Sequence, residues 1–194
     1  MNERRVVISV DPGVNGTGYA VWEHSIDGSH EVWSSRSVPV MLGEIRPEKV
    51  RHNEWTLRFE SVVTQFSQLL NQIRDLEDCI GIDIAYFEEP RMFVSAGGHA
   101  SASSGDLIKL TLLTGGLMAV AVDQGIETDL VPITAWKGQL PKDIVERRLI
   151  RYVESLGIHE ENEPDWYSEF ITGSFRDHVY DAFGIGLYVK GLQP

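Results

Sequence analysis

The chain has 194 residues and carries 29 acidic against 17 basic side chains, a formal net charge of −12. This length fits one domain over residues 1–194, because no linker rich in Pro, Gly or Ser divides the apolar segments. One cysteine, Cys79, excludes an internal disulfide, and we expect a cytoplasmic protein with no leader and no apolar stretch long enough to span a membrane. The acidic balance argues against the strongly basic class of nucleic-acid-binding proteins.

The first predicted element is a strand over Val6–Val10, whose apolar, β-branched residues are typical of a buried strand. Asp11 follows on a Pro-Gly bend, and Tyr19–Trp22 is predicted to pair with the first strand across a tight, glycine-rich turn. Asp11 therefore lies at a strand end. An Asp before Pro-Gly is also a common turn former, so this motif alone leaves both roles open.

A third strand is expected to end around Val32 to Val40. An amphipathic helix is predicted from Trp55 to Ile73. Its apolar face comprises Phe59, Val62, Val63, Phe66, Leu69, Leu70 and Ile73.

The next predicted strand, Ile82–Phe87, runs into Glu88, Glu89 and Pro90, where the proline ends a central strand. After an intervening helix, a strand parallel to the first is favoured, and the carboxyl ends of such strands meet at one edge. Side chains alternate, so only one of Glu88 and Glu89 can point inward toward Asp11. Surface acids on a solvated strand end are the alternative.

Met92 and Phe93 precede a segment rich in Gly, Ser and Ala, Ser95–Gly105, which is predicted to be a mobile loop. Three elements are expected after it: a helix at Leu107–Val122, a strand at Thr128–Ile133 and a basic-faced helix at Asp143–Leu156. An acidic stretch without Lys or Arg then extends from Tyr152 to Phe175.

A last helix is predicted over Ser174–Val189, where apolar residues recur at helical spacing and small residues permit a close approach to the sheet. His178 and Asp181 lie one turn apart at the margin of the apolar face. A hydrated N-terminal turn, with Asp177 complementing the helix dipole, is the structural alternative.

Taken together, Asp11 in Asp-Pro-Gly, Glu88 after a strand, and His178-x-x-Asp181-Ala-Phe-Gly-Ile-Gly resemble the RuvC family of Holliday-junction resolvases. The segment Pro132–Lys137 is similar to the family's basic active-site segment, and Gly138–Lys142 to phage-encoded members. The resemblance implies an α/β, RNase H-like fold in which a mixed five-stranded sheet, three antiparallel strands plus two parallel ones, is flanked by helices. Asp-Pro-Gly also opens the phosphate loop of actin-like ATPases, which are the alternative outside the nucleases.

The family's catalytic and metal-binding tetrad falls on Asp11, Glu88, His178 and Asp181. Lys137 falls near the scissile phosphate, and Glu89 and Asp177 remain rivals for two of the positions. The resemblance implies hydrolysis of phosphodiesters with two Mg²⁺ or Mn²⁺ ions, for which clustered carboxylates are suitable ligands. A neighbouring histidine can bind the softer ion or move a proton.

The resemblance implies a homodimer that resolves four-way DNA junctions by paired nicks, without a small-molecule cofactor. A nuclease for flaps or forks is the alternative within the same fold. The predicted DNA-binding residues are Arg91, Phe93, Lys109, Lys137 and Lys142. Because the chain is acidic overall, we expect modest affinity for DNA and strong salt sensitivity.

Overall fold

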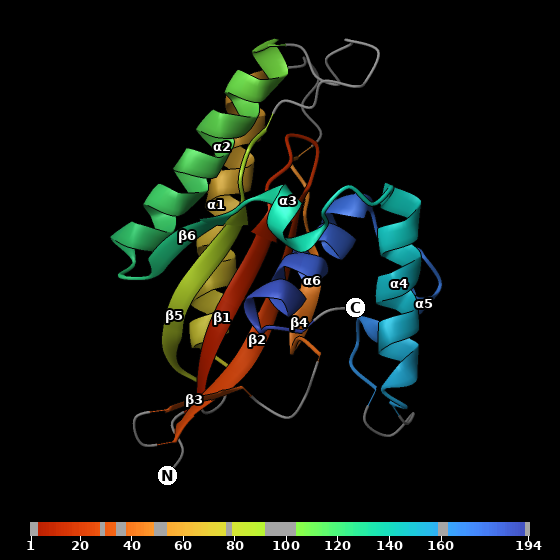
Figure 1. Cartoon of the computed structure of the whole chain (residues 1–194). Helices are drawn as coiled ribbons and strands as arrows, with labels where there is room; N and C mark the ends of the chain where they lie inside the picture. The colour runs from red at the N-terminus through yellow and green to blue at the C-terminus, as the bar shows by residue number, and fades with distance from the viewer. Residues whose placement is uncertain are drawn as a thin grey trace.

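The computed structural model describes residues 4–27, 30–33, 38–48, 54–76, 79–91, 104–158 and 163–192. The strands are β1 (Arg4–Asp11), β2 (Thr17–Asp27), β3 (His30–Trp33), β4 (Met41–Ile45), β5 (Cys79–Glu88) and β6 (Glu127–Val131). The helices are α1 (Trp55–Arg74), α2 (Ser104–Asp123), α3 (Ile133–Trp136), α4 (Lys142–Ser155), α5 (Tyr167–Ile171) and α6 (Asp177–Val189). One mixed sheet lies between helices on both of its faces (Figure 1).

The order and direction of the strands follow the sequence prediction. β1 pairs antiparallel with β2 and parallel with β5, and β5 pairs parallel with β6. Asp11 is paired with Gly18 across the hairpin, while Val10 is paired with Phe87 on β5. The carboxyl ends of β1 and β5 are therefore level with each other at one edge of the sheet.

Two strands share the third antiparallel position. β4 pairs with the first half of β2, Thr17–Val21, and β3 pairs with its second half, His24–Asp27. The five predicted positions across the sheet are present, but the described sheet contains six strands. The reason is length: β2 has 11 residues, whereas β3 has 4 and β4 has 5, so neither short strand covers it alone.

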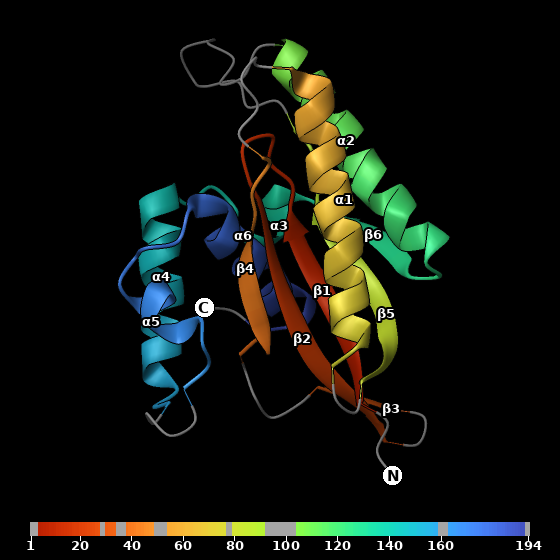
Figure 2. The same ribbon diagram turned by 180° about the vertical axis from the view of Figure 1, so that it is seen from behind.

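The first core lies between the sheet and the pair α1 and α2, which cover one face together (Figure 2). The predicted apolar face of α1 supplies five of its buried side chains, at Val62, Phe66, Leu69, Leu70 and Ile73. Alternate β1 residues Val6, Ile8 and Val10 meet them from the sheet. The apolar face of α1 therefore packs against alternate residues of β1, and this packing fixes the position of β1 and of its last residue, Asp11.

The second core lies on the opposite face, where α6 packs on β1 and β2 and is covered by α4 and α5. The acidic stretch after α4 is not wholly a solvated loop, because Trp166 and Phe170 are buried beside Phe183 of α6. α5 is absent from the elements predicted from the sequence, because its five residues are too few to show helical periodicity.

α2 corrects the expectation that no segment is long enough to span a membrane. Gly105–Asp123 has the length and mean hydropathy of such a span, 1.5 over its best window, and 22% of that window is buried. One face of the helix nevertheless belongs to the core, where Leu113, Leu117 and Ala121 are almost fully buried. We therefore interpret α2 as a helix of this fold with a second, outward apolar face.

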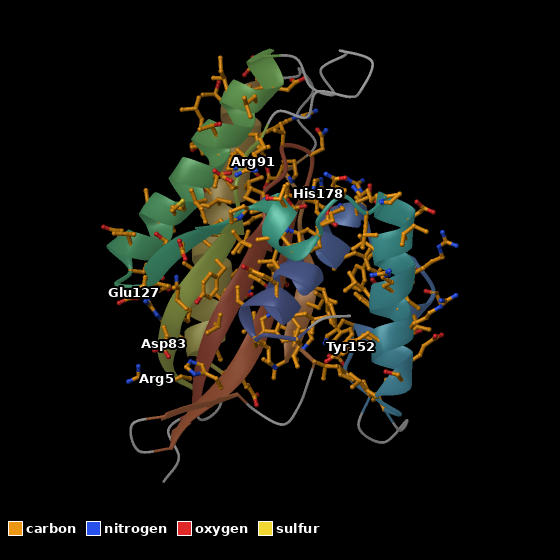
Figure 3. The ribbon with its side chains drawn as sticks, viewed as in Figure 1. Arg5, Asp83, Arg91, Glu127, Tyr152 and His178 are labelled. Carbon is orange, nitrogen blue, oxygen red and sulfur yellow. The ribbon has the colours of Figure 1, made fainter. Side chains whose placement is uncertain are left out.

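Residues at the far end of the sheet form a separate ionic cluster. The Asp83 carboxylate accepts a hydrogen bond from Arg5 at 2.6 Å, and His24 Nε2 lies 2.6 Å from its second oxygen. Figure 3 shows Arg5 and Asp83 at the end of the sheet opposite Arg91 and His178. The charges of this cluster are thus remote from the edge where β1 and β5 end.

Candidate active site

Asp11 is the last residue of β1, and only 5% of its surface is exposed. The bend after it closes through a hydrogen bond from Gly16 N–H to the Gly13 carbonyl. The hydroxyl of buried Thr17 accepts a hydrogen bond from the Gly13 backbone N–H and donates one to the Gly13 carbonyl. A carboxylate is therefore held at the sheet edge by a loop with its own internal bonds.

Glu88 is the last residue of β5, and its side chain lies toward Asp11 and Asp181, whose charges act on it. The Trp136 indole N–H donates a hydrogen bond of 3.2 Å to Glu88 Oε2. Glu89 is instead engaged by Arg91 at 2.7 Å. Of the two rival acids, the structure places Glu88 in the cluster and Glu89 beside it.

α6 brings the third carboxylate and the imidazole. His178 Nδ1 lies 2.7 Å from Asp11 Oδ2, and the Lys137 ammonium lies 3.2 Å and 3.3 Å from the two oxygens of Asp181. Asp177 is 58% exposed and pairs with Lys142 at 2.7 Å, outside the cluster. The structure thus brings together all five residues predicted to be catalytic, and their roles stay predictions.

α6 reaches this position because small residues let it lie directly on the sheet. A Cβ at Gly18 would overlap the backbone of His178 and Val179, and a Cβ at Gly186 would overlap the Trp22 ring. In addition, buried Ser9 donates a hydrogen bond of 2.7 Å to the Ala182 carbonyl. Close packing therefore sets the distance between Asp11 and the α6 side chains.

Lys137 reaches the cluster because the chain turns sharply after β6. The strand ends at Val131, not at Ile133 as predicted, because Pro132 is followed by the single helical turn α3. Trp136 packs against Gly184, which has no side chain to obstruct the ring. Trp136 is a site residue that the sequence prediction lacks, and the available signal was its position directly before Lys137.

The three carboxylates share a buried and mutually repulsive environment. Burial, reinforced by the charges of Asp11 and Asp181, raises the pKa of Glu88 to about 9. Burial and Asp11 also raise the pKa of Asp181 to about 6, against the opposing effect of Lys137. For His178, burial lowers the pKa, but the hydrogen bond and charge of Asp11 outweigh it and raise the pKa overall.

We predict that Glu88 makes the metal-free protein less stable as pH rises. Its pKa in the folded chain, about 9, lies above its ordinary 4.5, so the folded state holds a proton that the unfolded state releases. Stability should therefore fall between pH 4.5 and 9, and Glu88→Gln should flatten this fall. Thermal unfolding in EDTA across that range measures it, and equal slopes for the two proteins would contradict it.

The donor set suits a hard divalent cation, because it consists of carboxylates that repel one another until a positive charge separates them. In the part of the chain that the structure describes, no three His, Cys, Asp or Glu side chains form a ready-made metal site. Each carboxylate contacts a different protein group: Asp181 contacts Lys137, Glu88 contacts Trp136, and Asp11 contacts His178. The residues therefore fit metal binding by their chemistry, and occupation would require these protein contacts to rearrange.

Solved structures provide the comparison that decides the fold. RuvC of Thermus thermophilus superposes with a TM-score of 0.55 at 17% identity, covering 94% of this chain and 92% of that one. The same protein in complex with a Holliday junction substrate superposes with a TM-score of 0.55 at 16% identity, covering 94% of this chain and 91% of that one. The Holliday junction resolvase of fowlpox virus superposes with a TM-score of 0.52 at 12% identity, covering 96% of this chain and 97% of that one. The chain has the RuvC fold.

The predicted RNase H-like architecture is thereby confirmed. No family model matches the chain, and no curated protein matches its sequence. The likeness to RuvC is thus one of backbone arrangement, preserved where sequence identity is low. It identifies the fold, and the chemistry at the edge that carries Asp11 and Glu88 depends on this chain's own side chains.

The predicted DNA-binding residues flank the cluster on two sides. Lys142 lies close enough to affect the pKa values of His178 and Asp181. Arg91 and Lys109 line a cavity that His178 also borders. Phe93 and the predicted loop up to residue 103 lie outside the described residues, whereas Ser104 and Gly105 begin α2.

Proposed function

We propose that this protein is a metal-dependent endonuclease that resolves four-way DNA junctions by paired nicks. The observation that carries the proposal is the convergence of Asp11, Glu88 and Asp181, with His178, at one edge of a RuvC-fold sheet. Burial and the charge of Asp11 raise the pKa of both Glu88 and Asp181, and buried groups perturbed in this way concentrate at functional sites. RuvC of Thermus thermophilus is described in complex with a Holliday junction substrate, which supports branched DNA as the partner.

Asp11, Glu88, Asp181 and His178 would hold two Mg²⁺ or Mn²⁺ ions. When bound, such ions neutralise charge on the phosphate and lower the pKa of a water so that it can attack. Asp11 accepts a hydrogen bond from the Nδ1–H of His178, since a carboxylate offers only acceptors, and this orients the imidazole. Nε2 of His178 is then the atom that either binds an ion or takes up and releases a proton.

Lys137 and Trp136 have supporting roles in this proposal. Lys137 balances Asp181 in the free protein and lies where its ammonium can turn to a DNA phosphate. Trp136 anchors Glu88 through its indole N–H, and its packing on Gly184 fixes that donor. Both side chains come from α3 and its cap, so one short turn orients two of the three carboxylates.

Cleavage of labelled synthetic junctions tests the function directly. The substrates are a four-way junction, a flap and a linear duplex of matched sequence, each with Mg²⁺, Mn²⁺ or EDTA. We expect paired cuts in the junction alone, and only when the metal is present. The cleavage rate should fall steeply as salt is added, because the chain is acidic overall. Equal cutting of the flap would favour a general branched-DNA nuclease, and no cutting with any metal would overturn the proposal.

Paired nicks require two sites, and α2 offers the surface for a second copy of the chain. Its outward stripe follows the spacing of four and three residues that is typical of helix pairs, and it comprises Ile108, Leu112, Gly115, Ala119 and Val122. Ile108, Leu112 and Val122 are 56–60% exposed. Gly115 and Ala119 are small enough to let two helices approach closely. We therefore propose a homodimer formed through this stripe.

Leu112→Glu should convert the protein to a monomer, because it places a charge within the apolar stripe. Size-exclusion chromatography with light scattering measures this, and junction cleavage should change from paired cuts to single nicks. Leu156→Glu, at the exposed leucine that follows α4, is the control and should leave the dimer intact. A Leu112→Glu dimer, or binding of the wild type to lipid vesicles through α2, would contradict the assignment.

A further inference from the structure

A cavity of about 660 Å³ lies beside the carboxylate cluster, and none of its lining residues comes from α3 or α4. It is bordered by the Asp11 loop, by the first turns of α1 and α2, and by His178. Its volume is within the range of about 300–1,000 Å³ that small-molecule sites occupy. None of the roles assigned above to the carboxylates, Lys137 or Trp136 uses this cavity.

The cavity carries positive charge in a protein that is acidic overall. Arg58 donates a hydrogen bond of 2.8 Å to the Asn15 side-chain oxygen, and no carboxylate of the described residues pairs with its guanidinium. Lys109 lies 3.7 Å from Asp106, a loose contact between two well exposed side chains. Arg91 is more tightly neutralised, by Glu89 at 2.7 Å. Arg58 and Lys109 are therefore the cations with most charge left for a ligand.

An aromatic side chain completes the lining. Trp55 is the first residue of α1, is partly exposed, and borders the cavity. Its ring is supported by Phe59, at 5.8 Å between ring centroids. Trp55 and Arg58 are three residues apart, so they project from the same side of α1. An aromatic surface next to cations is the combination that binds single-stranded nucleic acid.

We propose that this cavity is a subsite for an unpaired DNA strand, with a base stacked on Trp55 and backbone phosphates bound by Arg58 and Lys109. The proposal rests on the nuclease function proposed above and adds to it the position of the strand on one side of the cleavage site. A base inside a duplex is covered on both faces, so only an unpaired or unstacked nucleotide can use the tryptophan. The subsite would therefore favour branch points over linear duplex.

The charge contribution is tested with a fluorescent single-stranded oligonucleotide, by anisotropy over a range of salt concentrations in EDTA. Arg58→Gln should weaken binding roughly tenfold and reduce the slope of log K against log salt by about 0.7, the value for one phosphate contact on a single strand. Asn15→Ala removes the hydrogen bond to Arg58 and keeps the charge, so it should bind like the wild type. Arg74→Gln, at the other end of α1, is the matched charge control.

The stacking contribution is tested with 2-aminopurine, whose fluorescence is quenched when the base stacks. The probe is placed at an unpaired position of a forked oligonucleotide. We expect quenching on binding to the wild type, and no quenching with Trp55→Leu together with a roughly 5- to 150-fold loss of affinity. Circular dichroism of each variant verifies that α1 remains folded.

The outcomes separate this inference from the proposed function. If the wild type cleaves junctions and neither Trp55→Leu nor Arg58→Gln changes strand binding, the subsite is wrong and the nuclease stands. If both variants lose strand binding while no junction is cleaved with any metal, the subsite stands and the proposed function fails. If Asn15→Ala weakens binding as much as Arg58→Gln, Arg58 acts by holding the Asp11 loop and the phosphate contact is refuted.

Discussion

Asp11→Asn should abolish junction cleavage while junction binding persists. The substitution keeps the shape of the side chain but removes the negative charge that faces both His178 and the other carboxylates. We expect cleavage to fall by about 10³-fold or more, the upper end of what removing one electrostatic contributor costs an enzyme. Single-turnover cleavage and a gel-shift assay on the same labelled junction measure the two properties separately.

Asp177→Asn is the matched control for Asp11→Asn, because it removes one carboxylate that pairs with Lys142 outside the cluster. Its cleavage rate should remain within a few-fold of the wild type. Equal loss of binding and cleavage in Asp11→Asn, accompanied by a lower melting temperature, would show that Asp11 supports the hairpin and not the reaction.

Gly18→Ala should damage both the fold and the site. A methyl group at this position would overlap the His178 carbonyl and the Val179 nitrogen, so α6 has to move away from β2. Forcing an extra carbon into a close-packed contact costs about 1–3 kcal/mol of stability. A shift of about 1 Å in His178 or Asp181 would in addition slow cleavage about a hundredfold.

The control for Gly18→Ala is Gly81→Ala on β5, where an added Cβ meets nothing within 4 Å. Thermal unfolding and cleavage at a temperature well below the transition should show Gly81→Ala close to the wild type in both. If Gly18→Ala lost stability but cleaved at the normal rate when folded, the position of α6 would not limit the reaction.

The strands that carry the acids were predictable because a short apolar run bounded by turn residues identifies a buried strand. Val6–Val10 leads directly into Asp11, and the proline at 90 marks the end of the strand that delivers Glu88. Parallel pairing of these strands follows from general connection rules, and the register confirms it. The sequence therefore predicts that the carboxyl ends of both strands meet at one edge of the sheet.

Contacts between distant side chains were not predictable in the same way. The hydrogen bond from Trp136 to Glu88 joins residues 48 positions apart, and no local pattern encodes its direction. The choice between Glu88 and Glu89 likewise depends on which face of β5 turns toward α6. α5 was missed because its stability comes from burying Trp166 and Phe170 against α6, which is tertiary packing and not helix propensity.

The contact between His178 and Asp11 spans 167 residues of the chain, from the first strand to the last helix. Contacts of this sequence separation are slow to form during folding, because a long loop has to close before they contribute any stability. A folding intermediate with only the β1–β2 hairpin and α1 in place would display Asp11 without its partners. Assembly of the carboxylate cluster is thus expected late in folding, and under the proposed function the chain would gain nuclease activity only once the native structure is complete.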